Sequence, residues 1–187
     1  LTSILREAVR RLTGETALVV TAGIKTGLNI LIDNPAELGS DMAATAVAAI
    51  AKYPVPLVIV DMGTATKLTA IDANGGFIGG AIAPGVAKSA DALSSGASLL
   101  PRVQIEAPRK CICSGTIDCM KSGIVFGAAA MVDGMLDRFA EELGALPTVI
   151  ATGGLAPRVV PHCRADIILD DNLILDGLRI LYEKNRR

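Results

Sequence analysis

The sequence predicts an α/β fold in which a three-stranded meander is followed by alternating helices and strands. Three observations support this prediction. Residues 57–60 form a continuous apolar run, the pattern of a strand that is covered on both faces. Two more strand-like segments follow after short turns, and a long apolar helix pattern comes later in the chain. This order differs from the simple alternation of strand and helix in a dinucleotide-binding fold.

The N-terminal part of the chain has helical and loop patterns. Apolar residues at helical spacing, with arginines on the other side, predict an amphipathic helix at residues 1–12. Residues 16–21 predict a short strand, and the glycines at residues 23–27 predict a loop. Asp33-Asn34-Pro35 is a turn sequence, after which the alanine-rich residues 36–52 predict a tightly packed helix.

After Pro56 the pattern changes from helical to extended. The three predicted meander strands are residues 57–60, 64–71 and 77–82, and the glycine-containing turn at 72–76 joins the last two. Further along we predict a long helix at 116–143 with its methionines in the core, a buried strand at 147–151, a helix at 173–182 and a solvated tail at 184–187.

Composition narrows the class of protein. With 187 residues, 51% of them hydrophobic, the chain can bury a core of one domain or two small lobes. A formal net charge of −1 leaves no basic surface for nucleic acid, so we expect no nucleic-acid partner. The apolar stretch at 42–60 is interrupted by Lys52, Pro54 and Pro56, so we predict a helix and a strand there rather than a membrane span.

The four cysteines allow two interpretations. Cys111, Cys113, Cys119 and Cys163, together with His162, contain sulfur and nitrogen ligands for zinc. The paired two-residue spacing of structural zinc sites is missing, however. The alternative is that they are free, reduced and mostly buried thiols of a cytosolic protein, and this is the reading that the spacing favours.

A nucleotide site is predicted where the first meander strand ends. Asp61 closes that strand, and Gly63 and Thr64 follow in a tight turn; Gly153 and Gly154 follow a later buried strand. A carboxylate can hold a metal-bound phosphate, glycine lets backbone N–H groups approach phosphate oxygens, and threonine adds an uncharged donor.

Several motifs in a fixed order carry a resemblance to a known family. They are Gly39-Ser40-Asp41, Asp61-Met62-Gly63-Thr64-Ala65-Thr66, Gly79-Gly80-Ala81-Ile82-Ala83-Pro84-Gly85, Thr116 with Met120-Lys121-Ser122-Gly123, and Thr152-Gly153-Gly154. Together they resemble the type III pantothenate kinases. The resemblance implies an actin-like ATPase (ribonuclease H-like) fold. It also implies a cytoplasmic homodimer that phosphorylates pantothenate with ATP in the first step of coenzyme A synthesis, using Mg²⁺ and a monovalent cation, K⁺ or NH₄⁺.

The resemblance also implies a role for each matching residue. Asp41 would be the catalytic base, Asp61 would hold the monovalent cation, and ATP would be bound by Gly63, Thr64, Gly153 and Gly154. The pantothenate site would include Gly39, Ser40, Asp41, Met42 and Thr116. Phosphoryl transfer requires mainly positioning, charge neutralisation and one group that orients the nucleophile, which fits this division. Taken alone, Asp41 would be read as an acid in the first turn of a helix.

Four departures from the family pattern bear on the substrate. Met42 stands where the family has an arginine, Ile32 replaces a tyrosine, and Lys67 replaces the last threonine of Thr-Ala-Thr-Thr. Cys113-Ser114-Gly115 replaces Gly-Lys-Asn before Thr116. We therefore expect weak pantothenate binding unless Lys25 or Lys67 reaches its carboxylate. Lys67 could instead serve ATP, or be a solvated lysine at a strand end.

The family's first phosphate loop, Asp-x-Gly-Asn-Thr, has no counterpart in this sequence. We expect an incomplete N-terminal lobe, with residues 1–54 as its remainder and residues 55–187 as the second ribonuclease H-like lobe. Two alternatives to a kinase remain at this point. One is a catalytically silent relative that acts as a binding or regulatory protein, and the other is a fragment in which the motifs are only structural turns.

Overall fold

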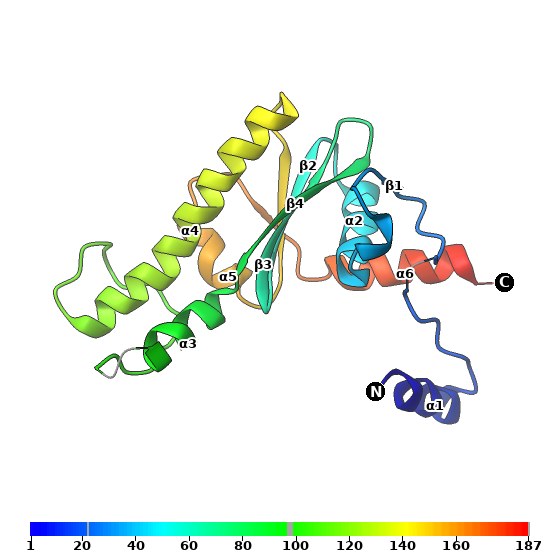
Figure 1. Cartoon of the computed structure of the whole chain (residues 1–187), viewed down its shortest axis with the longest axis horizontal. Helices are drawn as coiled ribbons and strands as arrows, with labels where there is room; N and C mark the ends of the chain where they lie inside the picture. The colour runs from blue at the N-terminus through cyan, green and yellow to red at the C-terminus, as the bar shows by residue number, and fades with distance from the viewer. Residues whose placement is uncertain (22, 97–98, 187) are drawn as a thin grey trace.

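The structure is a computed structural model that describes residues 1–21, 23–96 and 99–186. Its centre is a mixed sheet with the strand order β1, β4, β3, β2, β5, β6 within those ranges (Figure 1). The strands are β1 Asn29–Ile30, β2 Leu57–Met62, β3 Ala65–Ile71, β4 Gly76–Pro84, β5 Thr148–Thr152 and β6 Ile168–Leu169. β2, β3 and β4 form the predicted antiparallel meander, and β5 pairs with β2 in parallel.

Helices cover both faces of the sheet, as Figure 1 shows for α4 on one side and α2 with α6 on the other. The helices are α1 Thr2–Thr13, α2 Ser40–Lys52, α3 Val86–Gly96, α4 Thr116–Leu143, α5 Ala156–Val159 and α6 Leu173–Asn185, with 3-10 turns at Pro35–Glu37 and Val160–His162. Val58 and Val60 of β2 pack with α4, whereas Leu57 and Ile59 pack with α2. Burial on both faces explains the continuous apolar run of this strand.

The contact between α2 and α6 depends on small residues. α2 contributes a buried run of mostly alanine, residues 43–49. Gly177 of α6 lies so close to it that an added Cβ would overlap the carbonyl oxygen of Ala44. α2 begins at Ser40 rather than at residue 36, because Pro35–Glu37 forms a separate 3-10 turn that is capped by the Asn34 side chain.

Near the chain ends, one predicted element is wrong and another is right only in part: the predicted tail is solvated at Lys184 and Arg186, which are exposed, but it includes the end of a helix. Residues 16–21 form no strand; they are exposed or half-buried, and the edge of the sheet beside β4 is occupied by β1 instead. A strand requires a neighbouring strand for its backbone groups, which a local pattern does not reveal. The predicted solvated tail is partly helix, since α6 continues to Asn185, and Lys184 Nζ donates to the Thr26 carbonyl at 3.0 Å.

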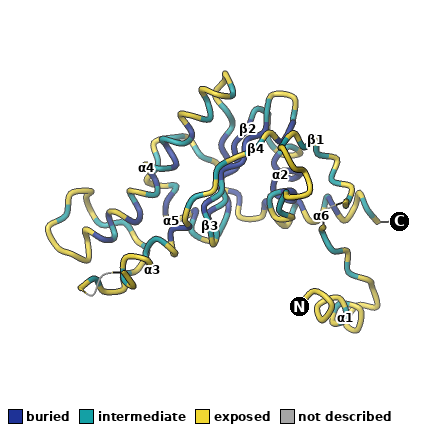
Figure 2. Tube along the Cα trace, viewed as in Figure 1, coloured by how far each residue is buried: buried dark blue, intermediate teal, exposed yellow. Residues whose placement is uncertain are grey.

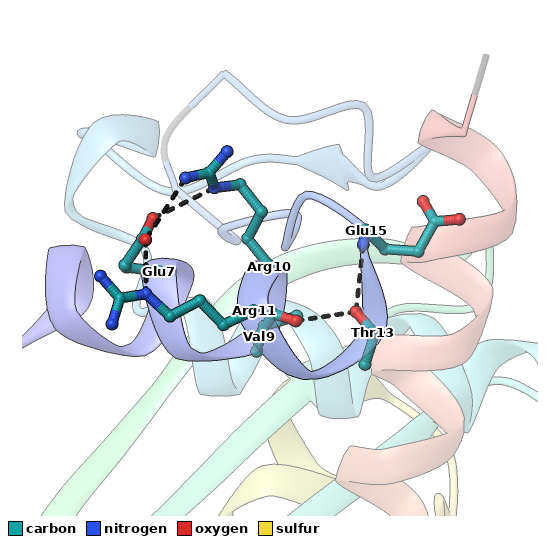
Figure 3. A network of polar contacts seen from close by, with 6 residues as sticks. All are labelled: Glu7, Val9, Arg10, Arg11, Thr13 and Glu15. Atoms are coloured by element: carbon teal, nitrogen blue, oxygen red, sulfur yellow. Dashed lines mark hydrogen bonds and ion pairs between the residues drawn. The ribbon is translucent and has the colours of Figure 1, made fainter.

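The amphipathic helix α1 is confirmed, but none of its residues is buried (Figure 2). It is supported by local polar contacts (Figure 3): Glu7 accepts from Arg10 at 3.1 Å and from Arg11 at 2.8 Å, and Thr13 Oγ1 donates to the Val9 carbonyl. The Glu15 backbone N–H donates to Thr13 Oγ1. Its apolar side chains therefore face solvent.

The cysteines are not mostly buried, which corrects that part of the prediction. Cys111 and Cys119 are exposed, and Cys113 and Cys163 are half-buried. Cys111 and Cys113 lie in the surface loop before α4, Cys119 lies in the first turn of α4, and Cys163 directly follows the 3-10 turn Val160–His162. Within the described residues, no group of three or more His, Cys, Asp and Glu side chains is arranged to hold a metal ion. Burial raises the pKa of the Cys163 thiol to about 11.

Among the helices of the described residues, α4 alone is long and apolar enough to cross a membrane by length and composition. Its buried side chains, among them Val125, Ala129 and Val132, pack against β2, β5 and α5. A core helix of this kind passes the same test of length and composition. The apolar character of α4 therefore serves the core, as its predicted methionine stripe suggested.

Candidate active site

Asp41 lies in the first turn of α2, directly after Gly39, which caps the helix, and Ser40. Its Oδ1 accepts a hydrogen bond from the backbone N–H of Met42 at 2.9 Å. The carboxylate also lies close to Gly39, where an added Cβ would be 2.7 Å from Asp41 Oδ1. The start of the helix thus favours a negative charge at residue 41 and sets its orientation.

Lys67 connects Asp41 to Asp61. Asp61 of β2 and Lys67 of β3 are directly paired across the hairpin, so their side chains extend from the same face of the sheet. Lys67 Nζ lies 2.8 Å from Asp61 Oδ2, and it also donates a hydrogen bond to Asp41 Oδ2. The Lys67 side chain is only 15% exposed. The interpretation of Lys67 as a solvated lysine is therefore wrong.

The opposite charges of Asp41 and Lys67 stabilise each other's ionised form. Burial by itself would raise the pKa of Asp41, but hydrogen bonds from Lys67 and the Met42 N–H hold it below its ordinary value. Burial by itself would lower the pKa of Lys67, but its hydrogen bonds to Asp41 and Asp61 raise it. Asp41 is therefore a carboxylate and Lys67 an ammonium at neutral pH.

A cavity of about 390 Å³ opens beside Asp61. Its lining residues are Thr45, Asp61, Thr152, Gly153, Gly154, Pro157, Asp171 and Ile174. The predicted residues Asp61, Gly153 and Gly154 meet there because Asp61 and Thr152 are paired in the parallel strands β2 and β5. Gly153 has a φ of 97°, and an added Cβ would be 2.7 Å from the Met62 backbone, so this turn requires glycine.

Three polar lining residues were given no role in the sequence analysis. Thr152 belongs to the Thr152-Gly153-Gly154 motif, but only the two glycines of that motif were predicted to bind ATP. Thr45 lies one turn after Asp41, and its hydroxyl donates to the Asp41 carbonyl at 3.1 Å, which links the cavity to the base. Asp171 lies just after β6, and no local pattern marks it.

Four other predicted residues do not line this cavity: Ser40, Gly63, Thr64 and Thr116. Gly63 is adjacent to Asp61, with a Cβ position 3.4 Å from Oδ1, and Thr64 is exposed in the following turn. Ser40 lines a separate cavity of about 580 Å³ beside the loop at 23–26. Thr116 is exposed at the start of α4, the helix that covers the other side of the sheet from α2 (Figure 1). The helices that carry Thr116 and Asp41 therefore lie on opposite faces of the sheet.

Two of the residues that depart from the family pattern pack against the same apolar cluster. Met42 and Ile32 are both partly buried, and both pack against the apolar cluster between α2 and the sheet that contains Ile59 and Phe77. An arginine at residue 42 would place a guanidinium beside that cluster. In this chain the corresponding surface is apolar.

Comparisons with known proteins show the family of this chain. A family model described as type III pantothenate kinase matches residues 1–138. The type III pantothenate kinase of Pelobacter propionicus is 47% identical over 186 residues, which cover 100% of this chain and 73% of the relative. That of Exiguobacterium sibiricum is 49% identical over 168 residues, covering 90% of this chain and 66% of the relative. The chain belongs to the type III pantothenate kinase family.

As a member of the type III pantothenate kinase family, the chain is part of a kinase, which confirms the predicted enzyme class. A catalytically silent accessory protein is not favoured, because the matching relatives are described as kinases. The chain covers 73% of the Pelobacter propionicus relative and 66% of the Syntrophus aciditrophicus relative.

A solved structure confirms the fold. It is from Campylobacter jejuni and is described as a Baf family transcriptional activator; the TM-score is 0.63 at 22% identity, covering 87% of this chain and 71% of that chain. At this identity the likeness concerns architecture only. It agrees with the predicted actin-like ATPase (ribonuclease H-like) α/β fold. The predicted division into lobes at residue 54 stays a prediction.

Proposed function

We propose that the protein transfers phosphate from ATP to pantothenate, forming 4′-phosphopantothenate in the first step of coenzyme A synthesis, with Asp41 as the base. The observation that carries the proposal is the convergence of Asp41, Asp61 and Lys67 beside the Gly153-Gly154 cavity. This arrangement supplies the two elements that phosphoryl transfer requires: a group that orients the nucleophile, and a cavity with glycine and hydroxyl groups in its lining that can take a phosphate.

The cavity is suited to the phosphates of ATP. Gly153 and Gly154, in the turn after β5, line the cavity without side chains, so a phosphate can come close to the backbone there. Gly63 and Thr64 follow Asp61 in the turn after β2 and lie outside this lining. The lining carboxylates and hydroxyls are hard oxygen donors of the kind that Mg²⁺ prefers, and Asp61 is already paired with Lys67, so Asp171 is the residue that would hold Mg²⁺ with the phosphates. Bound Mg²⁺ neutralises charge on the transferred phosphoryl group.

Exposure and charge support the proposed role of Asp41 on the substrate side. Its carboxylate is half exposed, with 49% of the side chain accessible, and remains ionised at neutral pH. It can therefore accept the proton of the substrate hydroxyl as the oxygen attacks the phosphoryl group. The helix start and Lys67 hold the carboxylate in one orientation, which keeps the base aligned between turnovers.

The substrate's carboxylate has fewer partners here than the family pattern implies. Met42 and Ile32 present apolar surface, and the Lys67 ammonium is already bonded to two carboxylates. Lys67 is therefore a poor candidate for binding the pantothenate carboxylate. We propose that pantothenate binds through its hydroxyls and apolar groups, and weakly for this family.

The proposal includes a cytoplasmic homodimer, as the family resemblance implies. The direct test is incubation of the full-length protein with ATP and pantothenate, with the product identified by mass spectrometry. The expected result is phosphopantothenate formed in equal amount with ADP. ADP release that does not respond to pantothenate would reject this substrate.

Sedimentation of the same sample tests the dimer, for which the expected mass is twice that of one chain.

A further inference from the structure

The Asp61 carboxylate does not fit the free monovalent cation that the family resemblance implies. Its Oδ2 already has the Lys67 ammonium at 2.8 Å. The same ammonium donates to Asp41, which leaves one of its three N–H groups for another acceptor. A free cation bound to this carboxylate oxygen would be repelled by the Lys67 ammonium, because the two positive charges would lie within a few ångströms of each other in a partly buried environment.

We propose that the Lys67 ammonium is a built-in replacement for the free monovalent cation, so that this enzyme works without K⁺ or NH₄⁺. The inference rests on the proposed kinase function. A lysine side chain ends in a substituted ammonium ion, and it therefore offers the same charge and hydrogen-bonding character as NH₄⁺. Lys67 is thus a positioning residue that acts through Asp41 and Asp61.

The fold delivers this ammonium to a defined position. Asp61 and Lys67 are paired in the β2–β3 hairpin, so the carboxylate and the amine begin on neighbouring strands and on one face. The Lys67 side chain is 15% exposed and that of Asp61 is 22% exposed, so both groups are shielded from water more than surface charges are. Such a pair is less sensitive to salt than an exposed ion pair.

The ammonium also has a structural task between the two carboxylates. Asp41 on α2 and Asp61 on β2 both accept from one donor, so without a cation between them their charges would repel each other. A free ion would perform this task only when bound. A covalently attached ammonium is present in every molecule, whatever the ionic composition of the medium.

The residue type at 67 is what differs from the family pattern, in which a threonine stands there. Lys67→Thr shortens the side chain and removes the ammonium group. Asp61 and Asp41 then have no cation between them, and a free cation can take that position. We therefore expect this substitution to create a dependence on free cations that the parent lacks. Lys67→Arg keeps a positive charge, and we expect it to remain independent of free cations.

The first measurement is turnover of the full-length protein in tetramethylammonium chloride, with K⁺, NH₄⁺ or Na⁺ added. For the parent and Lys67→Arg we expect a change of less than about twofold on adding K⁺. For Lys67→Thr we expect activity to be lower by roughly a hundredfold in tetramethylammonium and to recover at least about tenfold with K⁺ or NH₄⁺. Lys88→Thr, which removes an exposed lysine of α3, is the matched control and should behave as the parent does.

The second measurement is thermal unfolding, which needs no substrate. K⁺ in place of tetramethylammonium should raise the Tm of Lys67→Thr and leave the Tm of the parent unchanged, because only the variant has a place to bind the ion. A saturable rise of both turnover and Tm with K⁺ in the parent would overturn the inference. Cation-independent turnover and Tm in a folded Lys67→Thr would overturn it as well. If pantothenate is not phosphorylated at all, the Tm comparison still tests Lys67 separately from the proposed function.

Discussion

Asp61 and Lys67 face each other across the β2–β3 hairpin, with carboxylate and ammonium 2.8 Å apart. Their position follows from the hairpin itself, since the pairing of Met62 with Thr66 brings the preceding and following residues into register. Asp41 joins them from α2, which packs on the same face of the sheet. The two carboxylates of the candidate active site are therefore held by one partly buried ammonium group.

Asp41→Asn should remove the base while keeping the size of the side chain. We expect turnover of the full-length protein to fall by roughly a hundredfold or more, the usual effect of losing a positioned acid–base group. The measurement is the steady-state rate at saturating ATP and pantothenate. Asp91→Asn, at an exposed residue of α3, is the control for loss of one charge. Near-parental turnover by a folded Asp41→Asn protein would remove Asp41 from the mechanism.

Met42→Arg should strengthen pantothenate binding. A bidentate contact between arginine and a carboxylate is worth about 1.5–3 kcal/mol, or roughly tenfold to a hundredfold in affinity. Calorimetry of the parent and the variant would measure it. The analogue in which an alcohol replaces the carboxylate is the control, because it should bind both proteins equally. Equal affinity of both proteins for pantothenate itself would show that residue 42 does not govern recognition.

Asp170 links stability to pH. Lys52 Nζ donates to it at 2.5 Å and Tyr53 Oη at 2.8 Å, and the carboxylate is 8% exposed. Burial acts to raise the pKa of Asp170, but these hydrogen bonds hold it below the ordinary value of 3.8. A folded-state pKa that is lower than the unfolded one stabilises the protein above the unfolded value, and this stabilisation is lost as the pH falls through the folded value.

Asp170→Asn should therefore reduce the loss of stability on acidification. We expect the free energy of unfolding at pH 7 to drop by about 1–3 kcal/mol, with a smaller further decline between about pH 5 and pH 3 than in the parent. Urea unfolding at several pH values would measure both effects. Asp137→Asn in α4, for which the side chain is exposed, serves as the control. Identical pH slopes for Asp170→Asn and the parent would contradict the linkage.

Gly177→Ala should weaken the packing of α6 against α2. The new methyl group would overlap the Ala44 carbonyl oxygen, which belongs to backbone and cannot turn away. We expect a loss of about 1–3 kcal/mol in the free energy of unfolding. Gly123→Ala is a matched control in α4, where the added Cβ would meet nothing within 4 Å, and it should stabilise by about 0.5–1 kcal/mol. Thermal or urea unfolding of both variants would show whether the two changes have opposite signs.

Local patterns were sufficient for much of the fold and for part of the site. The apolar run of β2, the glycine turn before β4 and the helical spacing of α4 each reflect interactions between near neighbours, so their residues predict them. Motif order also predicted that Asp61, Gly153 and Gly154 belong to one site. Those residues end adjacent parallel strands, an arrangement that follows from the α/β order itself.

Long-range contacts decided the rest. Residues 16–21 have a strand-like composition, yet whether they pair depends on a distant neighbour, and β1 pairs with β4 instead. The role of Lys67 depends on Asp41, 26 positions earlier, being brought to the same face of the sheet by the packing of α2. Asp171 enters the cavity only because β6 pairs with β5. The sequence by itself determined which charged and polar groups are available for chemistry. The tertiary structure decided which of these groups lie close enough to form ion pairs, because the strength of an ion pair depends on the distance between segments that are far apart in the chain.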